Sequence, residues 1–291
     1  MSQTGWRTAV IGEHEKLSFR DGQLVITDGE QETALPVCQL ARVMLCSPEG
    51  SITLPLLNEL AGNRVSVLLC DEKRIPRAEL LPLLPGSSSG GIQDQAAWSE
   101  ARKDLAWAQI VRNKIDMQCG LLERLSLPEA AALAVYAADV LVGDVTNREG
   151  QAARLYFSAL FGPDFVRHAL DETNAALDYG YAILRSAVSR AIALHGCTPA
   201  LGICHCSRAN PVNLSCDLME PFRPIVDRIV VSDPYRTLTA EYKKQLIAVT
   251  QQECVYGSQR MNVDNTIQRY VSDVLRFMQQ PEERIGVVRF A

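Results

Sequence analysis

The stretch LLPLLPGSSSGG, Leu80–Gly91, divides the sequence into two parts that follow different patterns. Its prolines are followed by glycine and serine, a composition typical of a linker. Short segments rich in β-forming residues precede it, and long segments with apolar residues at helical spacing follow it. We therefore predict an α+β protein: a small β-rich domain over residues 1–82, a linker over 83–94, and a larger all-α domain over 95–291.

Before the linker, turn dipeptides separate short strands. Asp21-Gly22 and Asp28-Gly29 are typical turns between antiparallel strands. The continuous apolar run Val65–Cys70 is typical of a buried strand, and Pro55–Ala61 predicts one helix. The other expected strands are Trp6–Ile11, Lys16–Phe19, Gln23–Thr27 and Arg42–Cys46.

After the linker, apolar residues recur at helical spacing. Proline interrupts one of these segments at Pro221, which predicts a kink just after Glu220, because proline removes a helical hydrogen bond. The expected helices are Gln95–Leu125, Pro128–Val142, Asn147–Phe161, Asp171–Leu194, Asn213 to about Val231, Thr239–Gln251 and Val263–Gln279.

The composition is that of a globular protein. Of its 291 residues, 47% are hydrophobic and 22% charged. No apolar run is long enough to span a bilayer, and the start, MSQTGWRTAV, does not resemble a secretory signal, so we expect a cytoplasmic protein with no membrane partner. The nine cysteines are an odd number, which favours free thiols over a disulfide framework.

The net charge of −5 counts mildly against a nucleic-acid binder, because such proteins are usually basic. A local basic groove or a bound metal can nevertheless carry phosphate contacts. The overall charge therefore leaves a DNA-binding function open.

The segment LGICHCSRANPVNLSCDLMEPFRPIVDR, Leu201–Arg228, holds the first candidate site. His205 is one of only four histidines, and Asp217 and Glu220 are three residues apart, so on a helix they share one face. An imidazole with carboxylates suggests a divalent-metal site, and this mixture suits Mg²⁺ or Mn²⁺ better than zinc or copper. Both acids could equally be ordinary residues of a first helical turn.

A third acid, Glu149, lies in GDVTNREGQAARLYFSALFG, Gly143–Gly162. Thr146 and Glu149 match a capping box, which would occupy the glutamate in closing the helix start. The glycine at 150 and the alanines at 152 and 153 instead suggest a thin helix surface that another molecule approaches closely. Both interpretations stay open at this point.

Two further alternatives concern the neighbours of these residues. His205 could be a core residue, or it could join a zinc site with Cys197, Cys204, Cys206 and Cys216, although no C-x-x-C spacing occurs. Arginine forks suit phosphate groups, so nearby arginines are candidate DNA contacts; they could also pair with the acids, including Asp227. These arginines are Arg148, Arg208, Arg223 and Arg228.

Several long motifs in a fixed order resemble one family. They are the segments Gly143–Gly162, ALDYGYAIL (Ala176–Leu184) and NLSCDLMEPFRPIVDR (Asn213–Arg228), with WRTAVI (Trp6–Ile11) and LLCDEKRIPRAELLP (Leu68–Pro82) before the linker. Together they resemble the CRISPR-associated integrase, the spacer-acquisition endonuclease of bacterial adaptive immunity, and most closely its type II branch.

The resemblance implies an N-terminal domain that forms a homodimer and a C-terminal catalytic domain. It implies that Glu149, His205 and Glu220 hold a divalent metal, and that Asp217 is a nearby acid less directly tied to it. Its partners would be double-stranded DNA fragments, the CRISPR repeat, and a small ferredoxin-like companion subunit that joins two dimers in a heterohexamer. The thiols of Cys204 and Cys206 stand where family members often have other polar residues.

The leading hypothesis is therefore a metal-dependent DNA integrase and endonuclease. The 3′-hydroxyl of a short DNA fragment would attack a phosphodiester at the repeat border. The alternatives are a non-catalytic DNA-binding assembly scaffold and a structural zinc protein.

Overall fold

The computed structural model describes residues 5–12, 16–47, 49–81, 91–233, 237–280 and 283–291. The chain divides into two compact units: Met1–Ser89 with Ala193–Cys197, and Gly90–Ile192 with Thr198–Ala291. Residues 83–90 of the expected linker lie outside the described residues, and residues 91–94 belong to the helix Gly91–Ala96, so the domain limits stay a prediction. Within the described ranges, no helix has the length and apolar character needed to cross a bilayer.

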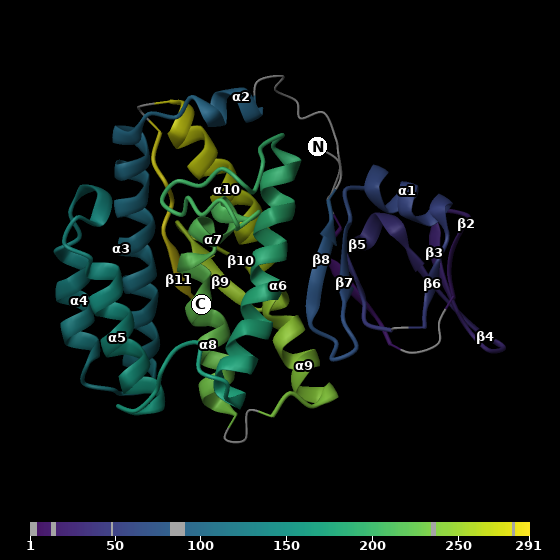
Figure 1. Ribbon diagram of the computed structural model, residues 1–291, viewed down its shortest axis with the longest axis horizontal. Coiled ribbons are helices and arrows are strands. Elements are labelled where there is room, and N and C mark those ends of the chain that lie inside the picture. Colours follow the sequence, from purple (N-terminus) through teal and green to yellow (C-terminus); the bar gives the residue numbers. More distant parts are fainter. Residues whose placement is uncertain (1–4, 13–15, 48, 82–90, 234–236, 281–282) are drawn as a thin grey trace. The chain divides into compact units, whose positions relative to one another are not determined.

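The described residues of the first unit form two four-stranded sheets (Figure 1). One has the order β1-β5-β7-β8, in which β8 runs antiparallel to β7 and the other neighbours are parallel. The other has the order β4-β3-β2-β6. The strands are β1 (Arg7–Ile11), β2 (Lys16–Arg20), β3 (Gln23–Asp28), β4 (Gln31–Pro36), β5 (Leu40–Leu45), β6 (Ser51–Ile52), β7 (Ser66–Cys70) and β8 (Pro76–Leu80), with a 3-10 turn, η1, at Val37–Gln39.

The residues of one tight turn and the packing of one helix explain how this unit folds. Arg20 pairs with Gln23 across a two-residue turn, and Asp21 and Gly22 both have positive φ, as such hairpins require. Helix α1 (Leu54–Gly62) contacts β2 and β7 and buries Leu56 and Leu60 in the core. The expected strands and helix are present, whereas β4, β6 and β8 were missed because they are short or exposed.

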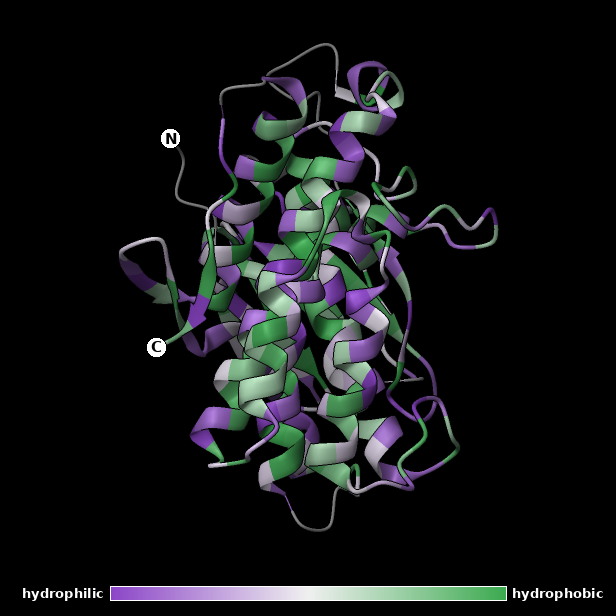
Figure 2. Ribbon diagram, turned by 90° about the vertical axis from the view of Figure 1, so that its left-hand side faces the viewer, coloured by the Kyte–Doolittle hydropathy of each residue, from purple (hydrophilic) through white to green (hydrophobic). Residues whose placement is uncertain are grey.

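The second unit is built around one long helix, α3. This helix contacts α4, α5, α8 and α10 and also strand β11 (Figure 1). Figure 2 shows apolar residues recurring between polar ones along the helices of this unit. The helices are α2 (Gly91–Ala96), α3 (Glu100–Arg124), α4 (Ala130–Ala138), α5 (Arg148–Phe161), α6 (Glu172–Leu194), α7 (Asn213–Leu218), α8 (Arg223–Ser232), α9 (Ala240–Ile247) and α10 (Val263–Gln279), with 3-10 turns η2 (Val142–Asp144), η3 (Glu220–Phe222) and η4 (Ala248–Gln251).

The expectation that this second part is all-α is wrong. Strands β9 (Glu253–Tyr256), β10 (Gln259–Asn262) and β11 (Val288–Phe290) form a three-stranded antiparallel sheet in the order β10-β9-β11. Each strand has only three or four residues, too few for an alternating pattern to be recognised. The side chain of Asn113 holds β11 in place through two hydrogen bonds to Val288. Its Nδ2 donates to the backbone carbonyl at 2.8 Å, and its Oδ1 accepts from the backbone N–H at 2.9 Å.

Helices α6 and α8 pack closely where Gly180 faces Val226. A Cβ on Gly180 would lie 2.4 Å from Cγ1 of Val226, so Gly180→Ala should lower the free energy of unfolding by about 1–3 kcal/mol. Gly120, inside α3, is the matched control, because a Cβ there meets only Phe290 at 3.5 Å. We expect Gly120→Ala to be neutral or to stabilise by up to about 1 kcal/mol. Urea unfolding measures both, and a Gly180→Ala protein as stable as Gly120→Ala would contradict the packing described.

Candidate metal centre

Helix α5 presents Glu149 from its first turn because other side chains cap the helix. Asp144 accepts hydrogen bonds from the backbone N–H groups of Arg148 and Glu149, at 2.8 and 3.0 Å. Asn147, the N-cap residue, has a left-handed φ of 52° and accepts a hydrogen bond from the N–H of Gly150 at 3.1 Å. The helix start is therefore satisfied without the Glu149 carboxylate.

The capping box expected from Thr146 and Glu149 is consequently wrong. The N-cap is Asn147, one residue later. Gly150 serves this cap, since a Cβ there would lie 2.7 Å from Oδ1 of Asn147. The glycine therefore leaves room for the Asn147 side chain that caps the helix.

The Asp217 carboxylate organises the loop that carries the histidine. Its Oδ2 accepts hydrogen bonds from the N–H groups of Ile203 and Cys204, at 2.6 and 3.1 Å. Its Oδ1 accepts one from the N–H of His205 at 3.1 Å. The loop closes tightly around this carboxylate, because a Cβ on Gly202 would lie 2.2 Å from the carbonyl oxygen of His205. Asp217 is fully buried, and both of its oxygens are used in holding the loop.

The same carboxylate orients the His205 ring. Nδ1 of His205 lies 2.6 Å from Oδ1 of Asp217, which leaves Nε2 as the nitrogen available to a metal. The hydrogen bond with Asp217 raises the pKa of His205 above its ordinary value, although partial burial acts in the opposite direction. Trp107 contacts the ring edge-on, with the ring centroids 6.1 Å apart. The histidine is therefore held from two sides, and its side chain stays 45% exposed.

Glu220 lies where the chain changes from one helix to the next. Helix α7 ends at Leu218, and Pro221 falls in the 3-10 turn η3 that leads to α8. The helix is interrupted as expected, but the interruption begins before Glu220 rather than just after it. One carboxylate oxygen of Glu220 pairs with Nε of Arg223 at 2.9 Å and the other with Nζ of Lys114 at 2.5 Å. Burial opposes ionisation of Glu220, but Arg223 and Lys114 outweigh it, so the pKa of this carboxyl lies below its ordinary value.

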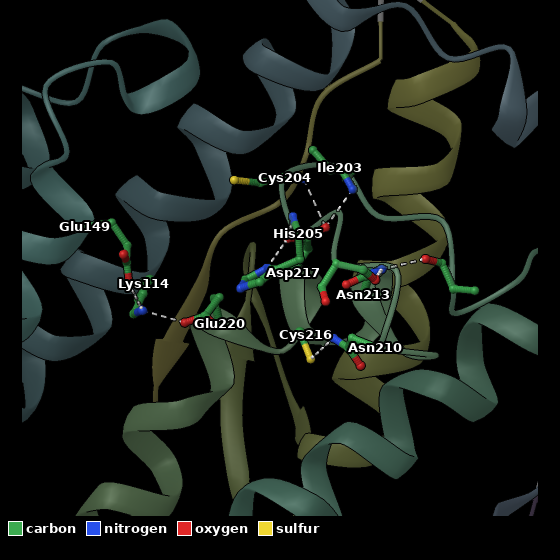
Figure 3. Close-up of polar contacts among 12 residues, drawn as sticks. Lys114, Glu149, Ile203, Cys204, His205, Asn210, Asn213, Cys216, Asp217 and Glu220 are labelled. Atoms are coloured by element: carbon green, nitrogen blue, oxygen red, sulfur yellow. Dashed lines mark hydrogen bonds and ion pairs between the residues drawn. The ribbon is translucent and has the colours of Figure 1, made fainter. Parts of the chain in front are cut away.

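Lys114, on α3, joins the two glutamates (Figure 3). Its buried ammonium group pairs with Glu149 as well as with Glu220. Burial lowers the pKa of Lys114, but the charges of Glu220 and Glu149 more than compensate, and the net shift is upward. The sequence reasoning missed this residue. A signal was present, because Lys114 follows Ile110 and Val111 by four and three residues, on the apolar face of its helix.

The chemistry of these side chains fits a hard divalent cation. Glu149 and Glu220 come from separate elements and already share one positive charge, and His205 is oriented nearby. Among the described residues, no three His, Cys, Asp or Glu side chains form a ready-made metal cage, because Lys114 occupies the place between the carboxylates. The ligand roles of the three residues stay a prediction at this point.

The zinc interpretation finds no support in the described part of the chain. The cysteines and His205 form no ready-made metal cluster there, and neither do Glu149, His205 and Glu220, so this absence does not separate the two interpretations. Cys204 and Cys206 are exposed, whereas Cys197 is buried. Burial, aided by the charge of Asp217, raises the pKa of the Cys204 thiol to about 11.

The candidate arginines differ in their surroundings. Arg223 belongs to the cluster through Glu220, and its guanidinium also lies 4.6 Å from the centre of the Tyr181 ring. Arg148 pairs instead with Asp139 at 3.1 Å, and Arg208 is exposed. Their DNA-contacting roles stay predictions.

A cavity of about 440 Å³ opens beside the cluster. Its lining includes Lys114, Glu149, Arg154, Arg167, Arg223 and Asp227. Tyr156 and Tyr181 both donate hydrogen bonds to Asp227, the first at 2.8 Å. Burial raises the pKa of Asp227 to about 6, against the effect of these hydrogen bonds. The cavity is therefore lined by basic side chains and by the carboxyl group of Asp227, whose pKa is raised.

The raised pKa of Asp227 gives a prediction about stability and pH. Between pH 4 and pH 6 the unfolded carboxyl is already ionised while the folded one is not, so rising pH favours unfolding. Asp227→Asn removes this effect, and we expect wild-type stability to fall relative to the variant by up to roughly 3 kcal/mol across that window. Urea unfolding at several pH values measures the difference. Parallel stability profiles for the two proteins would contradict the assignment.

Comparison with known proteins identifies the family of this chain. The family model described as “CRISPR associated protein Cas1” matches residues 9–241. A CRISPR-associated endonuclease Cas1 from Neisseria meningitidis serogroup C (strain 8013) is 40% identical over 228 residues, which cover 78% of this chain and 75% of that protein.

Two solved structures share the fold. A casposase bound to integration product has a TM-score of 0.77 and 18% identity, covering 96% of this chain and 92% of that one. A Cas6-RT-Cas1–Cas2 complex has a TM-score of 0.72 and 18% identity, covering 98% of this chain and 36% of that one. At these identities the solved structures establish the fold alone. The family match and the relative from Neisseria show that the chain belongs to the CRISPR-associated protein Cas1 family.

Proposed function

We propose that this chain is a metal-dependent DNA integrase and endonuclease of CRISPR adaptive immunity, with Glu149, His205 and Glu220 as its metal ligands. One observation carries the proposal. In a Cas1-family chain, the carboxylates of Glu149 and Glu220 come from different elements and both pair with the ammonium of Lys114. His205 has its Nδ1 atom bound to the buried Asp217 carboxylate, which leaves Nε2 available. This arrangement suits phosphodiester chemistry, in which negative charge grows on the phosphoryl oxygens.

The reaction is a transesterification at phosphorus. The 3′-hydroxyl oxygen of a short DNA fragment forms a bond to a phosphorus atom at the border of the CRISPR repeat. The bond from that phosphorus to the 3′-oxygen of the repeat breaks, and the proton lost by the attacking hydroxyl is balanced by protonation of the departing oxygen. Water in place of the attacking hydroxyl gives endonuclease cleavage.

A bound Mg²⁺ or Mn²⁺ would supply the Lewis-acid stabilisation that this reaction needs. The chain's own residues supply position and charge. Asp217 fixes the tautomer and direction of the His205 ring, and is therefore a supporting residue rather than a ligand. Arg223 keeps a positive charge beside Glu220, and Arg154 and Arg167 line the adjoining cavity, where they can contact DNA phosphates.

The proposed partners follow from family membership. We propose that the N-terminal unit forms a homodimer and that a small ferredoxin-like companion subunit joins two dimers in a heterohexamer. The similar complex that contains Cas1 together with Cas2 supports a companion subunit of this kind. The local basic residues of the cavity account for DNA binding by a chain whose net charge is −5.

The test is Glu149→Gln, which keeps the shape of the side chain but removes its charge. We expect strand transfer with Mn²⁺ to fall by about 100-fold or more, because a ligand for the catalytic ion is lost. Gel-shift binding of the DNA fragment should change little, since phosphate contacts come from other residues. The yield of joined product from a labelled fragment and a repeat-containing duplex is the measurement.

Glu100→Gln is the matched control for this experiment. Glu100 is an exposed glutamate at the start of α3, paired with Lys103 at 2.9 Å, and its replacement should leave strand transfer unchanged. Wild-type product yield from Glu149→Gln would contradict the role of Glu149 as a metal ligand. DNA binding without any joined product from the wild-type protein would favour a non-catalytic assembly scaffold over an integrase.

A further inference from the structure

The charges of the candidate centre balance before any ion enters. The carboxylates of Glu149 and Glu220 face the cations of Lys114 and Arg223, and the four groups are linked by ion pairs. A divalent ion placed between the two carboxylates would compete for the same oxygen atoms as the Lys114 ammonium. One of the two cations must therefore leave when an ion arrives.

Lys114 is better able to leave than Arg223. The guanidinium of Arg223 is held by Glu220 and also lies over the Tyr181 ring. A lysine ammonium is a compact charge on a flexible stem, so it can move without disturbing the backbone. Lys114 also lines the cavity of about 440 Å³, which provides space for its side chain.

A destination for the ammonium lies one turn further along α3. Gln118 follows Lys114 by four residues and therefore lies on the same face of the helix. Its side chain is buried at 2% exposure and lines the same cavity. Within the described residues, Oε1 of Gln118 has no hydrogen-bond partner, although a buried amide oxygen is normally satisfied. This oxygen is an acceptor placed within one helical turn of the lysine.

We propose that Lys114 is an exchangeable internal cation. In the metal-free protein it holds Glu149 and Glu220 together; when a divalent ion binds, the ammonium moves toward the cavity and donates a hydrogen bond to Oε1 of Gln118. The inference rests on the proposed function, because it takes the two glutamates as metal ligands. Because Lys114 holds the two glutamates together, the site keeps its shape without metal. Because Lys114 also competes with the ion, the site binds metal more weakly than it would without this lysine.

Calorimetric titration of the full-length chain with MnCl₂, without DNA, tests the proposal. Lys114→Met should bind Mn²⁺ about tenfold or more tightly than wild type, because no internal cation competes. Its thermal midpoint in EDTA should fall, since the buried carboxylate of Glu220 and the partly buried one of Glu149 lose a counter-ion. Lys103→Met, which removes a lysine of the same helix paired with Glu100, should change neither property. Mn²⁺ affinity in Lys114→Met equal to or below that of wild type would overturn the proposal.

A double-mutant cycle tests the role of Gln118. Gln118→Leu should weaken Mn²⁺ binding several-fold, because the displaced ammonium loses its acceptor, and the effect should vanish in a Lys114→Met background. An equal effect of Gln118→Leu in both backgrounds would show that Lys114 and Gln118 are not coupled. It would contradict the proposal that the Lys114 ammonium moves to Oε1 of Gln118.

The wild-type protein provides a measurement that needs no variant. Acetylation of Lys114 by N-hydroxysuccinimidyl acetate, followed by mass spectrometry, should increase several-fold in saturating Mn²⁺, while acetylation of Lys103 stays constant. Unchanged labelling of Lys114 at saturation would overturn the exchange. A wild-type chain and variants that all fail to bind Mn²⁺ at millimolar concentration would instead contradict the metal site itself, and hence the proposed function.

Discussion

Two carboxylates can both stay ionised in a mostly buried site only when nearby cations compensate their charge. Glu149 and Glu220 meet this condition through Lys114, whose ammonium pairs with both. Removing one member of such a buried group leaves an uncompensated charge, at a cost of several kcal/mol in typical proteins. The requirement for a cation therefore ties three separate elements together: α3 through the lysine, α5 through Glu149 and η3 through Glu220.

Helix α3 and the Asp217 carboxylate provide the frame for this group. The long helix contacts the other elements that carry the site and keeps Lys114 on its buried face. Asp217 gathers three backbone N–H groups and the ring nitrogen of His205, so the histidine loop has its shape before any ligand arrives. Such preorganisation matters for phosphodiester chemistry, because catalysis of this kind depends on charges fixed in advance.

Much of this arrangement could be predicted from the sequence, because local signals carry it. Spacing and composition indicated His205, Asp217 and Glu220 as candidates, and Pro221 predicted that the helix is interrupted near Glu220. Lys114 could not be identified so easily, because a lysine on a long helix is usually solvated and its partners are distant in sequence. The sheet β9–β11 was missed for a related reason, since its strands are short and β11 joins from the far end of the chain. The capping box at Glu149 failed because Asp144 and Asn147 supply the cap instead.

The central claim is that Glu149, His205 and Glu220 bind a single divalent ion. A crystal structure of the Mn²⁺-soaked protein, with anomalous data collected near the manganese edge, tests it most directly. We expect one strong anomalous peak within roughly 2.0–2.5 Å of a carboxylate oxygen from each glutamate and of Nε2 of His205. Asp217 should keep its hydrogen bond to Nδ1. A manganese peak at another cluster, or one contacted by fewer than two of the three side chains, would contradict the claim.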